Sequence, residues 1–155
     1  MEKKKNIIVV GGGHAGIEAA LAISRMGGQV ILITTDKNAI GRMSCNPAIG
    51  GLAKSHLVYE IDALGGIMGE AADVTALQYK TLNKSKGRAV WSSRAQVDKK
   101  KYSDYVRSFV NNNNNITVLS DHVVDVSIKN KVVTAVHTTK KVIPCSALII
   151  TTGTF

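Results

Sequence analysis

Three glycines near the start of the chain carry the clearest chemical signal in the sequence. Gly11, Gly13 and Gly16 have the spacing G-x-G-x-x-G and directly follow the apolar run 7–10. In a dinucleotide-binding turn the first glycine permits a sharp turn, the second lets the backbone approach a pyrophosphate, and the third allows close helix packing. The N-terminus of the following helix offers N–H groups to the phosphates. Because a strand precedes the glycines and a helical pattern follows, we favour dinucleotide binding over an ordinary turn.

A ribose-binding residue is expected at the end of the second strand, predicted over residues 30–34. In this class of fold an acid stands there, about 20 residues beyond the last glycine. Asp36 has this spacing, but Thr34 occupies the strand end. Two interpretations of Asp36 remain open: it binds a ribose, or it caps a local turn. The Thr34 hydroxyl is an alternative hydrogen-bonding group for the ribose.

A second candidate site is the loop over residues 43–51, which contains Cys45. The loop follows the second predicted strand, where a doubly wound sheet has its ligand crevice. Cys45 is therefore a candidate reactive thiol near that crevice. Most free cysteines are instead small buried apolar residues, and the bare sequence favours that alternative. The other cysteine, Cys145, lies far along the chain, so no disulfide framework or metal-ligand spacing is present.

Hydrophobic periodicity predicts the elements that would position these residues. A helix after Gly16 presents small and apolar residues to a sheet and stops at Gly27. A second helix, ended by Gly65 and Gly66, presents one face made of Leu52, His56, Tyr59 and Ala63, flanked by Leu57, Ile61 and Leu64. The other predicted elements are an extended stretch over 75–82, a helix over 97–110, a polar asparagine loop over 111–115, a strand over 116–119, a hairpin of 122–128 with 132–137, a short strand from 142, and a strand over 147–151.

Composition sets the outer limits of the interpretation. The chain has 155 residues, of which 45% are hydrophobic, and this suits one modest domain. It has no apolar run near the roughly 18 residues that would span a bilayer, and its start resembles no signal peptide. We therefore expect no membrane association and a reducing, cytoplasmic setting. The net charge of +9 is compatible with a polyanionic partner.

Much of the positive charge lies in the basic segment, which we define as residues 80–101. Its eight cations, accompanied by one acid (Asp98) and by Trp91, are Lys80, Lys84, Lys86, Arg88, Arg94, Lys99, Lys100 and Lys101. Such a segment either contacts phosphates, with the aromatic ring stacking on a base, or forms a solvated basic face. Arg94 has a further alternative, because Asp98 lies four residues on and would pair with it at a helix start.

Five motifs in order give the chain a family resemblance. It resembles the tRNA uridine 5-carboxymethylaminomethyl modification enzymes (MnmG), also called the glucose-inhibited division protein A family. The motifs are GGGHAGIEAA (11–20), MSCNPAIGG (43–51), EIDALGG (60–66), SKG (85–87) and RAQVD (94–98). The second is more specific than the glycine fingerprint, which many flavoproteins share. Arg88 and Trp91 depart from the family pattern of proline and arginine at these positions, which affects the local loop rather than the membership.

The resemblance implies a flavoprotein that modifies carbon 5 of the wobble uridine in certain tRNAs. The family binds FAD, takes hydride from NADH at a site outside this chain, uses methylenetetrahydrofolate as carbon donor, and works as a homodimer with an MnmE-type GTPase. By residue matching, the FAD pyrophosphate is held by Gly11, Gly12, Gly13, His14, Ala15 and Gly16, and Val123 contacts the adenine end. Cys45 matches a cysteine thought to assist the chemistry. The basic segment then becomes a candidate surface for tRNA or for cofactor phosphates.

The expected fold class is α/β: a Rossmann-like FAD-binding domain with a βαβ start, a parallel sheet and a small antiparallel β-meander. Because the family continues well beyond residue 155, we expect residues 1–155 to be the N-terminal part of that domain, truncated before the NADH insert and a helical C-terminal part. Two other function classes remain open. One is an FAD or NAD oxidoreductase acting on a small molecule, and the other is an inactive nucleotide-binding fragment.

Overall fold

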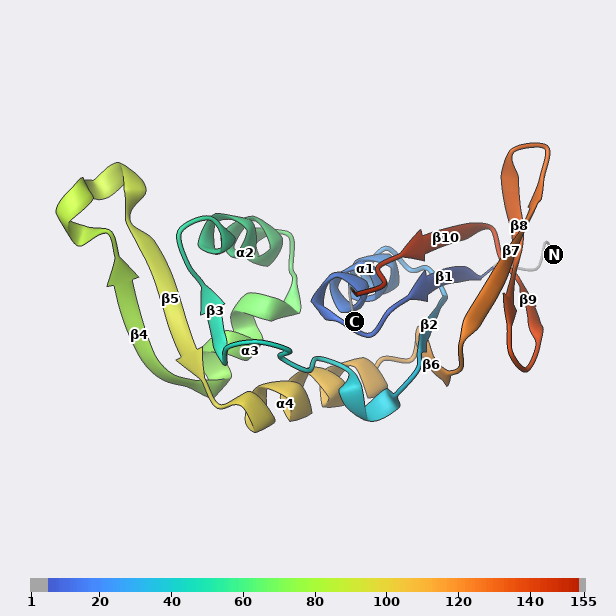
Figure 1. The fold of residues 1–155 in the computed structure, drawn as a ribbon, viewed down its shortest axis with the longest axis horizontal. Coiled ribbons are helices and arrows are strands. Elements are labelled where there is room, and N and C mark those ends of the chain that lie inside the picture. The colour runs from blue at the N-terminus through green and yellow to red at the C-terminus, as the bar shows by residue number, and fades with distance from the viewer. Residues whose placement is uncertain (1–5, 154–155) are drawn as a thin grey trace. The chain divides into compact units, whose positions relative to one another are not determined.

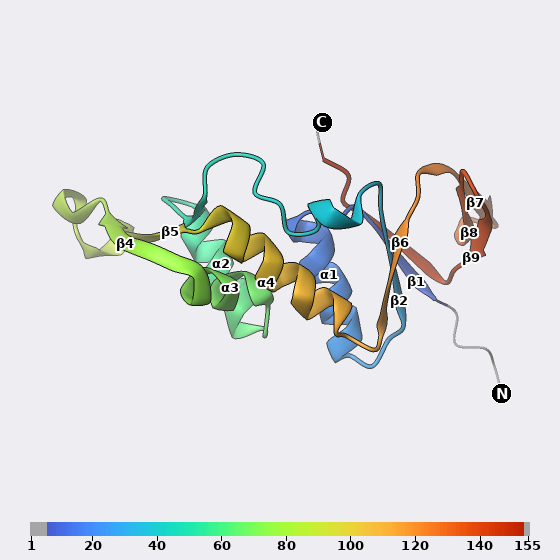
Figure 2. The same ribbon diagram turned by 90° about the horizontal axis from the view of Figure 1, so that it is seen from below.

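The computed structural model describes residues 6–153 and divides them into two compact units (Figures 1 and 2). The parallel-sheet unit contains residues up to Gly41 and from Arg107 onward, and the inserted unit runs from Arg42 to Val106. Helix α4 (Lys99–Asn111) crosses the boundary between the two. This division is finer than the single modest domain that composition suggested.

The parallel sheet has the strand order β10-β1-β2-β6 and positions the glycine turn. Its strands are β1 (Ile7–Val10), β2 (Val30–Thr34), β6 (Ile116–Ser120) and β10 (Ala147–Ile150), all mutually parallel. Ile8, Val9 and Leu32 are fully buried, as expected for strands covered on both faces. Helix α1 (His14–Arg25) buries Ile17, Ala20, Leu21 and Ser24, as expected for a helix that presents small and apolar residues to the sheet. The predicted α/β fold with a βαβ start is confirmed.

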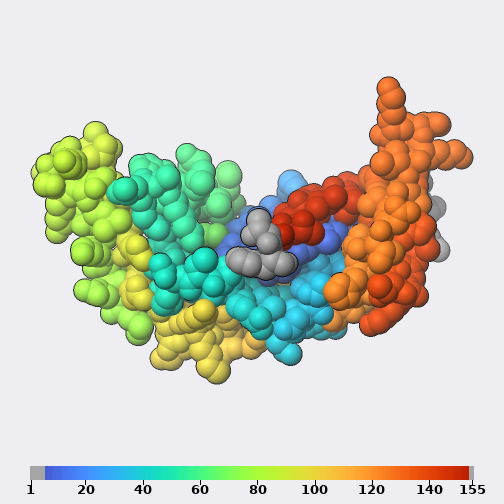
Figure 3. Space-filling model, viewed as in Figure 1, coloured from blue at the N-terminus to red at the C-terminus, as the bar shows by residue number. Residues whose placement is uncertain are grey.

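A small antiparallel sheet, β7-β8-β9, completes this unit. Its strands are β7 (Val123–Lys129), β8 (Val132–Thr138) and β9 (Val142–Pro144). Asn130 and Lys131 both have positive φ, at 51° and 62°, which is the backbone of a tight hairpin turn. Figure 3 shows this turn as projecting orange atoms. Buried Val136 and Ile143 pack with Ile8 and Ile33 of the parallel sheet, so the predicted meander is confirmed and joined to the core.

The asparagine loop after α4 forms hydrogen bonds to two elements of the parallel-sheet unit. The Ser24 hydroxyl donates to Asn113 Oδ1 at 2.8 Å, and the Val30 amide donates to the Asn115 carbonyl at 2.9 Å. The asparagine run is a polar loop as predicted, and it also fastens the end of α1 and the start of β2. Within α4 the buried residues are Tyr102, Val106 and Val110, whereas Phe109 is 43% exposed.

The inserted unit departs most from the sequence prediction. It consists of β3 (Ala48–Gly50), α2 (Lys54–Ala63), α3 (Ile67–Thr75), β4 (Ala76–Leu82), the 3-10 turns η2 (Lys84–Lys86) and η3 (Arg88–Val90), and β5 (Ser92–Val97). The strands form a sheet in the order β3-β5-β4, with antiparallel pairing. β3, α3 and β5 were not predicted.

The predicted apolar face of the second helix is wrong. α2 buries Ser55 and Val58, while Leu57 and Tyr59 are exposed. The reason is local bonding: the Ser55 hydroxyl donates to the Gly51 carbonyl at 2.8 Å and turns this small polar residue inward.

None of the helices in residues 6–153 has the combined length and hydropathy that crossing a bilayer requires.

Candidate functional site

Four loops meet at the carboxyl edge of the parallel sheet. The glycine turn follows β1, residues 35–36 follow β2, residues 121–122 follow β6, and Thr151 follows β10. Because all four strands are parallel and in register, these loops leave the same edge. In open α/β sheets this edge is where ligands bind.

The three fingerprint glycines differ in the space that surrounds each of them in the turn. Gly11 has φ of 115°, and a Cβ there would lie 2.4 Å from the Thr151 carbonyl oxygen. A Cβ on Gly16 would lie only 1.9 Å from the Gly11 carbonyl oxygen. A Cβ on Gly13 meets nothing within 4 Å. The protein itself therefore requires glycine at 11 and 16, whereas the space beside Gly13 is open for a ligand.

The rest of the predicted pyrophosphate loop surrounds this space. Gly13 is the N-cap of α1, whose first turn contains no acid, so its N–H groups suit an anion. Gly12 packs over Thr34, since a Cβ on Gly12 would lie 2.9 Å from the Thr34 hydroxyl. His14 begins α1 half-buried, and Ala15 beside it is exposed. This cradle fits a pyrophosphate group.

The structure supports the capping interpretation of Asp36. Its Oδ1 accepts from the Asn38 amide at 2.8 Å and caps the 3-10 turn η1 (Lys37–Ala39). Thr34 at the strand end is 8% exposed, and its hydroxyl donates to the Asp36 carbonyl at 3.3 Å. The strand end therefore carries a buried hydroxyl in place of the acid expected for ribose binding.

Val123 begins β7 immediately after this edge. It is half-buried and packs against the cluster of Ile8, Ile33, Val136, Ile143 and Cys145. The core therefore fixes the position of Val123, and its contact with an adenine stays a prediction.

Asp121 is a residue that sequence reasoning missed. It is 4% exposed, its Oδ1 accepts from the His122 amide at 2.8 Å and from the Thr139 hydroxyl, and its own amide donates to the Thr34 carbonyl at 3.0 Å. The bond from Thr139 lowers the pKa of Asp121 to about 2, although burial acts the other way. Asp121 thus joins the ends of β2 and β6 to the turn before β9. An acid directly after a strand was the only signal available in the sequence.

We predict that Asp121 contributes acid-sensitive stability. Its folded pKa of about 2 is below the ordinary 3.8, so its contribution is complete above pH 3.8 and is lost as the pH falls toward 2. Asp121→Asn should lower the melting temperature at neutral pH and flatten its fall over this acid range. The control is Asp125→Asn, because Asp125 is exposed and its Oδ1 accepts from its neighbour Val126. Equal acid profiles for wild type and Asp121→Asn contradict the prediction.

The two cysteines are in opposite environments. Cys45 is exposed, in the loop that leads into β3, with the Ser44 hydroxyl 4.0 Å from its sulfur. Cys145 is buried, and burial raises the pKa of its thiol. The interpretation of Cys45 as a buried apolar residue is therefore wrong. Cys145 is the cysteine that fits that description. That Cys45 lies beside the dinucleotide crevice stays a prediction.

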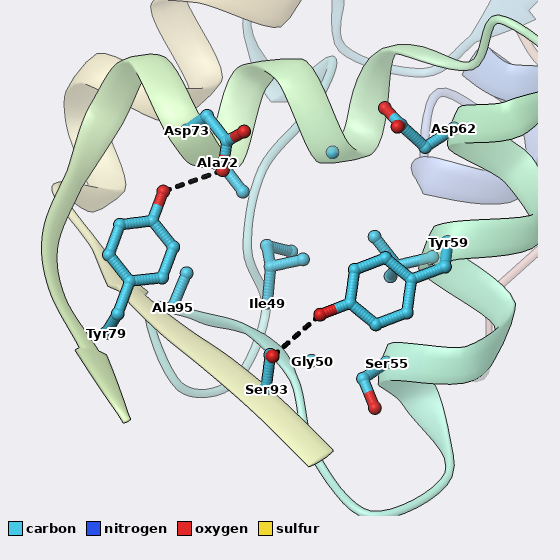
Figure 4. A pocket seen from close by; sticks show the side chains of 12 residues that line it. Ile49, Gly50, Ser55, Tyr59, Asp62, Ala72, Asp73, Tyr79, Ser93 and Ala95 are labelled. Atoms are coloured by element: carbon cyan, nitrogen blue, oxygen red, sulfur yellow. Dashed lines mark hydrogen bonds between the residues drawn. The ribbon is translucent and has the colours of Figure 1, made fainter. Parts of the chain in front are cut away.

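A cavity of about 100 Å³ lies in the inserted unit, between α2, α3 and the antiparallel sheet (Figure 4). Tyr59 and Tyr79 line it, and their hydroxyls donate to Ser93 Oγ and Asp73 Oδ1, both at 2.6 Å. The bond to Asp73 raises the pKa of Tyr79 to about 12. Because both hydroxyls are held by the protein, these tyrosines connect the helices to the sheet. No sequence motif marked this cavity.

The basic segment is divided among several elements. Within η2 and η3, Arg88 lies over the Trp91 ring at 5.8 Å from its centroid, and the indole N–H donates to the Lys84 carbonyl at 3.3 Å. The alternative in which Arg94 pairs with Asp98 at a helix start is wrong, because Arg94 lies in β5. Asp98 instead accepts from the amides at the start of α4.

Among the described residues, no group of three His, Cys, Asp or Glu side chains is placed to hold a metal ion.

Comparison with known proteins places the chain in a family. The sequence profile of the family described as "Glucose inhibited division protein A" matches residues 6–155. The chain belongs to the glucose inhibited division protein A family. It is 50% identical over 151 residues to the tRNA uridine 5-carboxymethylaminomethyl modification enzyme MnmG of Aquifex aeolicus, which covers 97% of this chain and 24% of that protein. The same enzyme of Campylobacter hominis is 51% identical over 151 residues, with 97% and 24% covered.

Solved structures agree with the family assignment. The crystal structure of Aquifex aeolicus GidA matches with a TM-score of 0.94 and 49% identity, covering 99% of this chain and 26% of that one. A GidA-related protein from Thermus thermophilus matches with a TM-score of 0.61 at 12% identity over 99% of this chain and 55% of that one, and this likeness shows the fold alone. The chain therefore spans about a quarter of the length of these MnmG and GidA relatives.

Proposed function

We propose that this chain is the FAD-binding part of a flavoenzyme that modifies tRNA. The observation that supports this most directly is the open space beside Gly13, the N-cap of α1. At Gly11 and Gly16, in contrast, an added Cβ would collide with protein atoms. Such a cradle suits the pyrophosphate of a dinucleotide. Family membership supports FAD as that dinucleotide.

The residues that would hold FAD are those of the carboxyl edge. The backbone of Gly11, Gly12, Gly13, His14, Ala15 and Gly16 binds the pyrophosphate, and Val123 contacts the adenine end. When bound, FAD supplies hydride and electron transfer. The chain's own contribution at this site is binding and orientation.

The relatives are named for the 5-carboxymethylaminomethyl modification of tRNA uridine. The proposed reaction is the formation of such a group on the wobble uridine of certain tRNAs. NADH serves as reductant from a site outside these residues, an MnmE-type GTPase is the partner, and the enzyme is a cytoplasmic homodimer. These residues form the N-terminal part of the FAD-binding domain. The net charge of +9 suits a polyanionic substrate.

Cys45 is the proposed catalytic residue of this part of the enzyme. Its thiol is exposed and therefore accessible to a uracil ring. It lies in the motif over 43–51, which is more family-specific than the glycine fingerprint.

The test is the visible absorbance spectrum of the purified complete protein, combined with a gel shift against unfractionated tRNA. We expect a flavin spectrum and a tRNA complex. A protein that contains flavin but does not bind tRNA would point to an oxidoreductase acting on a small molecule. A colourless protein under conditions that load flavin would point to an inactive nucleotide-binding chain. Either result overturns the proposal.

A further inference from the structure

The inserted unit carries two cations on one face of its sheet and a third, at the start of α2, within electrostatic range of one of them, and we call the three the cation cluster: Lys80, Arg94 and Lys54. Lys80 in β4 is the direct cross-strand partner of Arg94 in β5, so their side chains share one face of the sheet. On the other side of β5, Arg94 pairs with Gly50 of β3. The chain then passes through Gly51, whose amide donates to the Ser93 carbonyl at 3.0 Å, to Lys54 at the start of α2.

The like charges in this cluster repel one another. Although Lys54 is an exposed residue, partial burial lowers the pKa of its amine, and the like charge of Arg94 lowers it further. The Cys45 thiol shifts the pKa of the same amine in the opposite direction, so Cys45 lies within electrostatic range of Lys54. Like charges placed directly opposite on a sheet are destabilising. Within residues 6–153, no carboxylate forms an ion pair with any of these three cations.

Other cations of the basic segment are accommodated differently. Lys100 forms an ion pair with Asp104 at 2.6 Å, and Arg88 stacks on Trp91. Each of these has a partner within its own element or turn, as expected for a basic surface that only faces solvent. The cation cluster instead concentrates positive charge without compensation, which is the arrangement expected where an external anion binds.

The neighbours of the cluster favour a nucleic acid as the source of that anion. Gln78 and Gln96 form the next cross-strand pair on the same face and offer neutral hydrogen-bonding groups. The Cys45 thiol is exposed and lies within electrostatic range of Lys54. A phosphate held at Lys54 would bring its nucleotide toward that thiol.

We propose that Lys54, Lys80 and Arg94 bind a backbone phosphate of tRNA and thereby seat the nucleotide whose base meets Cys45. This inference rests on the proposed function, since it assumes a tRNA substrate. It adds to it the surface that orients the RNA at the thiol. The cations are positioning residues, and the thiol remains the group that meets the base.

The experiment uses the complete FAD-loaded protein and unfractionated tRNA as the probe. The variants are Lys54→Met and Arg94→Met, with Arg94→Lys to retain the charge. Lys129→Met is the control, because Lys129 is an exposed cation of β7 in the other unit. Three quantities are measured: the salt dependence of tRNA affinity, the protection of Cys45 by tRNA from iodoacetamide, read by mass spectrometry, and the FAD content.

We expect each Met variant to reduce the slope of log affinity against log salt, by no more than about one unit because the cluster holds a single phosphate, and to lose the protection of Cys45 by tRNA. Arg94→Lys should keep most of both, and Lys129→Met should match the wild type. FAD content should not change.

Two results would overturn this inference while leaving the proposed function intact. One is an unchanged salt slope and unchanged protection in both Met variants, with normal tRNA binding by the wild type. The other is loss of FAD with normal tRNA affinity, which would assign the cations to the flavin phosphates. Failure of the wild type to bind tRNA would overturn both proposals together.

Discussion

Gly13→Val should abolish FAD binding and leave the fold intact. Gly13 has φ of −78° and ψ of −179°, an extended conformation that a β-branched residue adopts readily. Because a Cβ at this position meets no protein atom within 4 Å, the valine side chain enters only the space assigned to the pyrophosphate. Steric overlap with a bound group costs about 3 kcal/mol, so affinity should fall by about a hundredfold or more. Flavin absorbance after gel filtration of the complete protein measures the loss.

Gly16→Ala provides the matched contrast three residues away. Its Cβ would lie 1.9 Å from the Gly11 carbonyl oxygen, so the turn or the helix has to move. We expect a loss of stability on the order of 3 kcal/mol, seen as a lower melting temperature, with any loss of FAD following from it. If Gly13→Val retains stoichiometric FAD, or if it unfolds as readily as Gly16→Ala, the assignment of the space beside Gly13 is wrong.

The glycine turn could be predicted because its determinants are local. The close approach of Gly16 to the Gly11 carbonyl involves residues five apart in a strand-turn-helix unit whose pattern is legible in sequence. The hairpin of β7 and β8 is a similar case, since the turn at Asn130 and Lys131 lies directly between two apolar strands. In both places local conformation and the hydrophobic pattern agree.

The inserted unit could not be predicted because distant pairings decide it. β3 is three residues of a glycine-rich motif, and it becomes a strand only by pairing with β5. α2 turns Ser55 inward because that side chain bonds to the Gly51 carbonyl, while Leu57 on the same helix stays exposed. Apolar periodicity therefore indicated that a helix exists but gave the wrong buried face.

The candidate sites divide in the same way. The spacing of the fingerprint glycines marked the pyrophosphate cradle, whereas the cation cluster depends on the register that sets Lys80 opposite Arg94. The sequence showed a basic segment with no indication of which cations would meet. The role of Asp121 likewise depends on the Thr139 hydroxyl, which the fold brings in from the turn before β9.

Cys45→Ser should abolish tRNA modification without affecting stability or FAD content. The thiol is exposed, so exchange of sulfur for oxygen should change the free energy of unfolding by no more than about 0.5 kcal/mol. Loss of a group that takes part in the chemistry should lower the modification rate by about a hundredfold or more. The measurement is the modified fraction of wobble uridine, by mass spectrometry of tRNA from cells that depend on the variant.

Cys145→Ser is the control that separates chemistry from packing. Cys145 is 2% exposed in the core of the parallel-sheet unit, so a hydroxyl there enters an apolar site at a cost of about 1–3 kcal/mol. It should lower the melting temperature, and modification should fall only in proportion to the folded enzyme that remains. If Cys45→Ser behaves like Cys145→Ser, the loss of activity is structural and the catalytic role of Cys45 is wrong. Normal modification by a stable Cys45→Ser enzyme removes that role as well, because an exposed thiol whose loss changes neither stability nor rate performs no step of the reaction.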